Sequence, residues 1–74
     1  MRYAMIIETG ERNYSAYLPD VPGCIATGKT VEEVKQRMRE AIKLHFGGMR
    51  EDGQPIPQPT SFADYVEAAL NQRQ

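Results

Sequence analysis

The amino-acid sequence predicts an α+β fold, in which a three-stranded antiparallel sheet packs on one long helix in the order βββα. Three observations predict it. Residues 2–18 contain two strand-like runs separated by a glycine-containing loop. A Pro-Gly turn then leads into a third short run at residues 24–27. Residues 31–50 carry apolar side chains at helical spacing, directly after a threonine.

The first two strands are predicted over residues 2–9 and 13–18. The first run is rich in β-forming residues, and the loop after it begins with Gly10. The second strand is expected to end before Pro19, because proline has no N–H to donate to a neighbouring strand. Alternation predicts that one face of this strand carries Tyr14, Ala16 and Leu18.

A turn and a third strand follow. Pro22 presets the backbone angle of the second position of a type II turn, and Gly23 accepts the positive φ that the third position requires. Residues 24–27 are then predicted to form a short third strand. Three consecutive strands joined by short connections pair most economically as an antiparallel sheet.

The long helix is predicted over residues 31–50. Thr30 is a suitable N-cap, and Glu33 stands three residues later, which together make a capping-box pattern. Asp52 and Gly53 are expected to stop the helix. An apolar stripe should cover one face of the sheet, and it consists of Val31, Val34, Met38, Ala41, Ile42, His45 and Met49.

Two further elements are predicted after the helix. Residues 54–59 contain three prolines at alternate positions and should form an extended strap that returns along the body. A short second helix is predicted over about residues 61–70, with Thr60 or Ser61 as its cap. Residues 71–74 are expected to fray. The apolar edge of the second helix consists of Phe62, Tyr65, Val66 and Ala69.

Size, charge and cysteine content limit the class of protein. Residues 1–74 suffice for a single domain with a thin stability margin, which favours self-association into a dimer or tetramer. A formal net charge of -1 argues against a dedicated binder of nucleic acid or anionic lipid. One cysteine allows no internal disulfide, and no apolar run reaches the roughly 20 residues that span a bilayer. We therefore expect a cytoplasmic homo-oligomer without membrane association.

The sequence contains no recognisable set of catalytic, metal-binding or cofactor-binding residues. His45 is the only histidine, with no second ligand at zinc spacing and no nucleophile near it in the sequence. Cys24 lacks the cationic setting that makes a thiol reactive. Acidic residues stand at strand ends, turns and the C-terminal segment, and residues 5–7 carry no carboxylate. We therefore predict a non-enzymatic protein without a cofactor.

The sheet face opposite the helix has no evident cover within the chain. The residues expected on it include Ala4, Ile6, Tyr17 and Ile25. An uncovered apolar face or an unpaired sheet edge is a usual site of protein binding. We therefore predict that a partner binds at this face or at a sheet edge.

Three segments stand in a specific order along the chain. They read YLPDVPGC at residues 17–24, TGKTVEEV at residues 27–34 and HFGGMREDGQPIPQP at residues 45–59. Together with the N-terminal strand they cover about residues 2–66, and this series resembles the HicB-like antitoxin family. The positions that match the family motif should shape the fold, and they are Pro19, Asp20, Pro22, Gly23, Cys24, Gly28, Thr30 and Glu33.

The resemblance implies both a fold and a function. The implied fold is a partial ribonuclease H-like fold that lacks the nuclease carboxylates. The implied function is that of an antitoxin in a type II toxin–antitoxin system, which binds a small, basic, RNA-cleaving HicA-like toxin and masks it sterically. The family offers no catalytic residue to transfer to this chain.

Two alternatives stay open beside this interpretation. One is a standalone structural or ligand-sensing domain without a toxin. The other is a degenerate ribonuclease H-like nuclease, which needs carboxylates within metal-bridging reach. Many family members also append a ribbon–helix–helix or helix–turn–helix domain that binds operator DNA. Because this chain stops before such a domain, direct DNA binding is not expected.

Overall fold

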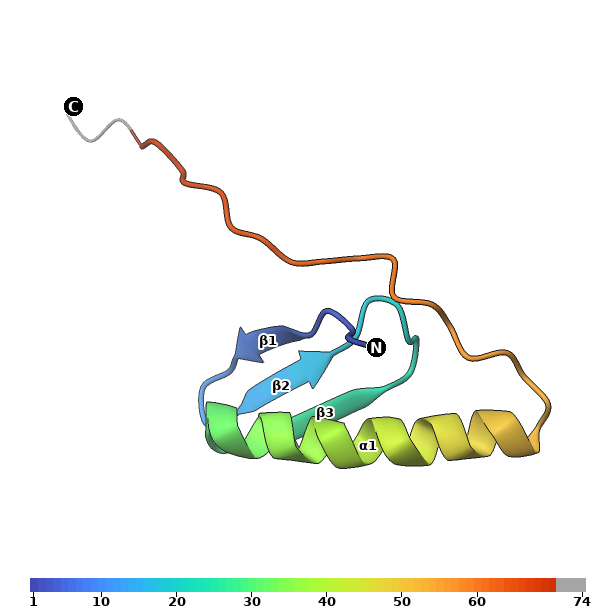
Figure 1. Ribbon diagram of the computed structural model, residues 1–74. Coiled ribbons are helices and arrows are strands. Elements are labelled where there is room, and N and C mark those ends of the chain that lie inside the picture. Colours follow the sequence, from blue (N-terminus) through green and yellow to red (C-terminus); the bar gives the residue numbers. More distant parts are fainter. Residues whose placement is uncertain (71–74) are drawn as a thin grey trace.

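The computed structural model describes residues 1–70 and contains three strands followed by one long helix (Figure 1). The elements are β1 (Ile6–Thr9), β2 (Tyr14–Tyr17), β3 (Ile25–Gly28) and α1 (Val31–Glu51). The strands form one antiparallel sheet in the order β1-β2-β3. The predicted three-stranded sheet backed by a long helix is therefore confirmed. The fraying predicted for residues 71–74 falls outside the described residues.

The first strand is shorter than the predicted residues 2–9. In the observed register Ile6 lies opposite Tyr17, which is the last residue of β2. Beyond this pair the chain after β2 enters a turn that contains Pro19, so residues 2–5 have no ladder partner. The other two strands match their predicted bounds to within one residue.

The core lies between the inner face of the sheet and the first half of α1. At the centre of this face, Ala16 of β2 lies opposite Ile7 on one side and Ala26 on the other. The fully covered apolar residues are Ala16, Leu18, Val21, Cys24, Val34 and Met38. Complete burial of a large apolar side chain stabilises a fold by about 1.5–3 kcal/mol, so this small cluster is the main source of stability.

The predicted apolar stripe of α1 is buried only where the sheet covers it. Val34 and Met38 are buried, whereas Val31 at the start of the helix is exposed. Figure 1 shows that α1 runs on past the sheet. There Ile42 and Phe46 are only partly buried against the core. Within the part of the chain that the structure describes, no helix has the length and apolarity needed to cross a bilayer.

Residues 54–59 form the predicted extended strap. The strap turns back from the end of α1 and passes along the body (Figure 1). The Tyr3 hydroxyl donates a hydrogen bond to the Pro57 carbonyl, which ties the strap to the N-terminal segment. The Tyr3 ring packs edge-on against Phe46 of α1, with ring centroids 5.6 Å apart. Tyr3 therefore links the strap to the second half of the helix.

The helix predicted over residues 61–70 is absent from the structure. This segment is extended and leads away from the body (Figure 1). Its large apolar side chains are almost entirely exposed, since Phe62, Tyr65 and Val66 are 87%, 96% and 92% exposed. A helix of this length is marginal in water without packing partners, which explains the difference from the prediction. We call residues 62–70 the tail.

Candidate partner-binding surface

Residues 19–24 form the connection between β2 and β3. The Val21 amide donates a hydrogen bond to the Leu18 carbonyl (3.1 Å), and the Cys24 amide donates to the Val21 carbonyl (3.2 Å). Gly23 has a φ of 87°, the left-handed value that the third position of a type II turn requires. The predicted turn is therefore present, and it directs Val21 and Cys24 into the core.

Cys24 is a core residue and not an accessible thiol. It is buried, and its Sγ lies 3.7 Å from Sδ of Met38. Burial raises the pKa of the Cys24 thiol, which disfavours the reactive thiolate form. The side chain therefore acts as a small apolar group that packs the turn against α1.

Asp20 has a role that the sequence prediction missed. Its carboxylate accepts four hydrogen bonds of 2.8–3.0 Å, from the backbone amides and the hydroxyls of Thr60 and Ser61. The Ser61 amide is the main cause that lowers the pKa of the Asp20 carboxyl. Thr60 and Ser61 were expected to cap a helix, but they attach the end of the strap to the β2–β3 turn. In the sequence, the adjacent hydroxyl residues Thr60 and Ser61 directly after the strap are the feature that could have indicated a carboxylate partner.

The start of α1 is held by a modified capping box. The Glu33 amide donates to Oγ1 of Thr30 (3.0 Å), as predicted. The Glu33 carboxylate accepts a hydrogen bond from the Lys29 amide (2.6 Å). In a standard capping box it would accept from the amide of the cap residue, Thr30. The same carboxylate pairs with Arg37 (3.0 Å), which also donates to the Thr27 carbonyl (3.2 Å). Glu33 therefore joins the helix start to the end of β3.

Gly28 lets α1 approach β3 closely. A Cβ at this position would lie 2.8 Å from the Val34 backbone nitrogen and 3.1 Å from the Val34 Cα. These are backbone atoms of the helix, so a side chain here would have to push α1 away from the sheet. The motif glycine is thus needed for packing.

The sheet face opposite α1 presents a row of apolar side chains. Tyr17 lies opposite Ile6 of β1 and Ile25 of β3, so these three residues stand side by side across the sheet. Tyr17 is 41% exposed and Ile25 is 68% exposed, while Ile6 is partly buried. We call Ile6, Tyr17 and Ile25 the outer row. It contains three of the four predicted partner-surface residues, and the fourth, Ala4, lies before β1 begins.

His45 and the acidic residues form no recognisable metal centre in the described chain. Within residues 1–70, no three His, Cys, Asp or Glu side chains are grouped so that they could hold a metal ion. The His45 ring packs at an angle to Phe46, with centroids 6.4 Å apart, and its Cε1 lies beside Gly23. His45 therefore contacts the β2–β3 turn from the second half of α1.

Residues 3–73 match the family of the HicB-like antitoxin of bacterial toxin–antitoxin systems. The chain belongs to this family. The resemblance inferred from the ordered motifs is therefore confirmed, and the motif residues now have structural roles in the turn, the helix start and the strap contact.

The matches to two curated relatives cover only part of each relative's length. It is 36% identical, over 89% of its length, to an uncharacterised 14.9 kDa protein from the rep–hol intergenic region of Haemophilus phage HP1, of which it covers 50%. It is 38% identical, over 64% of its length, to a UPF0150 protein of Helicobacter pylori, of which it covers 65%. The chain thus spans about half to two thirds of these relatives.

A solved structure titled HicA3 and HicB3 toxin–antitoxin complex contains a chain with the same fold. The two structures superpose with a TM-score of 0.70 at 27% sequence identity. The match covers 80% of this HicB-like chain and 69% of the other chain. The sheet and helix described above therefore also occur in a chain of that complex.

Proposed function

We propose that this HicB-like chain is an antitoxin that binds a HicA-like, RNA-cleaving toxin and masks it sterically, without catalysing a reaction itself. Family membership supports this proposal. The observation that carries it is the fold shared with a chain of a HicA3–HicB3 complex. The site of action in this proposal is the cytoplasm, where such a toxin would meet its RNA.

We propose that the outer row is the surface that binds the toxin. Its apolar side chains stand on a regular sheet, and burying apolar surface stabilises a complex by about 25 cal/mol per Å² before the costs of association. Glu8 stands in the neighbouring row, opposite Ser15, and is exposed. An acidic group beside an apolar centre suits a basic partner.

The proposal is tested by titrating this chain against a small, basic, HicA-like toxin. We expect the two proteins to copurify, and we expect RNA cleavage by the toxin to cease near a stoichiometric ratio. Undiminished cleavage at a saturating excess of this chain would contradict the antitoxin role. That result would favour the standalone structural or ligand-sensing domain.

The binding surface is tested with exposed apolar positions on two faces. Ile25→Lys and Tyr17→Lys place a cation in the outer row, whereas the control Leu44→Lys alters a residue of α1 that is 79% exposed. We expect the outer-row variants to need roughly tenfold more protein for half inhibition, a change of about 1.4 kcal/mol. Thermal unfolding checks that all three variants fold. Equal inhibition by all of them would assign the toxin to another surface.

We further propose that the chain forms a homo-oligomer. A domain of this size buries a small core, and the outer row and the tail both leave large apolar side chains exposed. Covering either surface with a second copy would enlarge the apolar area buried per chain. Light scattering of the purified protein measures the number of chains.

A further inference from the structure

The tail and a groove beside α1 have complementary chemistry. We infer that the tail of one copy docks in this groove on a second copy and folds into a helix as it binds. The inference specifies how the self-association proposed above takes place, and it does not depend on the toxin.

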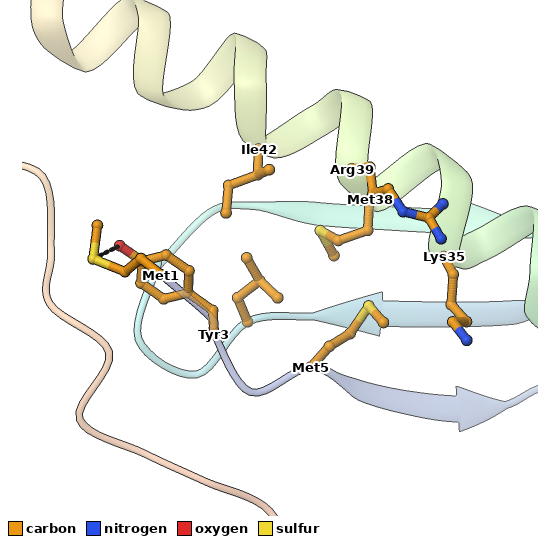
Figure 2. A pocket seen from close by; sticks show the side chains of 8 residues that line it. Met1, Tyr3, Met5, Lys35, Met38, Arg39 and Ile42 are labelled. Carbon is orange, nitrogen blue, oxygen red and sulfur yellow. Dashed lines mark hydrogen bonds between the residues drawn. The ribbon is translucent and has the colours of Figure 1, made fainter.

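The groove lies between α1 and the segment that leads into β1 (Figure 2). It has a volume of about 220 Å³. Figure 2 shows side chains of α1 facing those of the N-terminal segment across it. Its apolar lining consists of Met1, Tyr3, Met5, Leu18, Met38 and Ile42, and its two cations are Lys35 and Arg39.

The dimensions and lining of the groove indicate a protein side chain as its occupant. Its volume is below the roughly 300–1,000 Å³ of typical small-molecule sites, so it suits an anchoring side chain of another polypeptide. Methionine side chains adapt to the shape of an apolar partner. In the described residues, neither Lys35 nor Arg39 has a carboxylate within ion-pair distance. The groove is therefore suited to an apolar segment that also carries acidic residues.

The tail is such a segment. Its large apolar residues have the spacing of one helical face, and they are Phe62, Tyr65, Val66 and Leu70. Asp64 and Glu67 fall outside this apolar face. All of these side chains are exposed. A helix that meets an apolar groove gains the packing that the isolated tail lacks.

The strap contact positions the tail for this folding. The Asp20 carboxylate accepts hydrogen bonds from the amides of Thr60 and Ser61, directly before the tail. A negative charge at free amides is favourable at the N-terminus of a helix. The tail is therefore anchored at the end from which its helix would begin, while the rest of it is free to bind.

The charges select a second copy over a basic toxin as the occupant. The cations Lys35 and Arg39 would repel a basic partner but attract Asp64 and Glu67. The tail also leaves the body on the side away from α1 (Figure 1), so it does not fold back onto the groove of its own copy. If each copy gives its tail to the other, the two contacts are identical and form a closed twofold dimer.

Charge reversal tests the inference with the full-length chain. The groove variant is K35E/R39E, the tail variant is D64K/E67K, and the control K43E/R50E reverses two exposed cations of α1 outside the groove. We expect analytical ultracentrifugation to show a wild-type dimer and a dissociation constant weakened roughly tenfold or more in each of the first two variants. We expect an equimolar mixture of these two variants to restore the dimer. In the mixed dimer the reversed tail meets the reversed groove, and the second contact joins a wild-type tail to a wild-type groove. The control should associate like the wild type.

Helix content provides a second readout. Circular dichroism should show a gain in helix as the wild-type concentration rises through the dissociation constant, and no such gain in the tail variant. Self-association that both reversals leave unchanged would overturn the tail contact while leaving the homo-oligomer intact. A wild-type monomer at all concentrations would overturn both. Toxin inhibition is measured separately, so neither result bears on the antitoxin role.

Discussion

The helix α1 and the tail carry the same kind of sequence pattern, but only α1 is helical. In α1, Val34 is completely buried against the sheet, whereas Tyr65 in the tail is 96% exposed. α1 also begins with a threonine cap, whose hydroxyl oxygen accepts a hydrogen bond from the Glu33 amide. Apolar residues at helical spacing therefore predict a helix reliably only where the fold supplies a surface for them.

The two regions also differ in what holds them in place. The body is held by a continuous apolar core. The strap is held by polar contacts at two points, from Tyr3 to Pro57 and from Asp20 to Thr60 and Ser61. Regions with few buried apolar contacts open at lower free energy than the core does. We therefore expect variants in the core to unfold the whole body, and variants at the strap contact to release the strap alone.

The largest expected effect comes from truncating the core side of α1. Met38→Ala removes a buried side chain, and we expect it to destabilise the protein by about 2–5 kcal/mol. The matched control Leu44→Ala changes a residue of the same helix that is 79% exposed, and it should stay within about 0.5 kcal/mol of wild type. Urea unfolding measures both. Similar losses in the two variants would mean that the helix is stabilised evenly around its circumference.

A smaller effect is expected where the helix approaches the sheet. Gly28→Ala places a Cβ against the Val34 backbone nitrogen, and the forced shift should destabilise the protein by about 1–3 kcal/mol. Gly48→Ala adds the same methyl group inside α1, where no atom other than the local helix backbone lies within 4 Å, and should stabilise the protein by about 0.5–1 kcal/mol. Thermal unfolding of the pair should therefore show shifts of opposite sign. A stabilised Gly28→Ala variant would refute the close approach of α1 to β3.

The helix cap should contribute less than either of these. Thr30→Ala removes the hydroxyl that accepts a hydrogen bond from the Glu33 amide, and we expect it to destabilise the protein by about 1 kcal/mol. Thr30→Ser keeps the hydroxyl and serves as the control, with most of the stability retained. The same urea titration distinguishes them. If serine fails to restore stability, the threonine contributes through its methyl group and not through the cap.

Local sequence signals predicted the body well. The Pro22-Gly23 pair predicted the turn, and the Thr30 cap predicted the helix start, because each acts on neighbouring residues of the chain. The start of β1 at Ile6, four residues later than predicted, was not foreseen, because strand length depends on where the partner strand stops pairing. Pairing register is a property of two segments, and one segment alone does not show it.

The features that the sequence did not predict involve residues distant in the chain. Asp20 was interpreted as a turn residue, and its contact with Thr60 spans 40 positions. The motif pattern identified Asp20 but carried no information about its partner. The outer row was predicted more closely, since alternation placed Ile6, Tyr17 and Ile25 on one face, and the register set them side by side.

The smallest expected effect on overall stability tests the strap contact. Asp20→Asn replaces one of the two carboxylate oxygens with an NH₂ group, which cannot accept a hydrogen bond. The amides and hydroxyls of Thr60 and Ser61 therefore lose some of their hydrogen bonds to residue 20. We expect faster hydrogen exchange at the Thr60 and Ser61 amides with little change in the urea midpoint of the body. The control Asp52→Asn changes an exposed carboxylate at the end of α1, outside both the strap contact and the tail, and strap protection should be unchanged. A large fall in the urea midpoint of Asp20→Asn would mean that strap and body unfold as one unit.

The same contact should depend on pH in a defined direction. The folded-state pKa of Asp20 is lowered from its ordinary value of 3.8, chiefly by the Ser61 amide, so the ionised carboxylate is the form that holds the strap. The contact is therefore complete above pH 3.8 and is lost as the pH falls through the lower folded-state pKa. Amide chemical shifts of Thr60 and Ser61 should follow this titration in the wild type and not in Asp20→Asn. Shifts that move only with global acid unfolding would show that the carboxylate does not hold the strap, and that the strap follows the body for another reason.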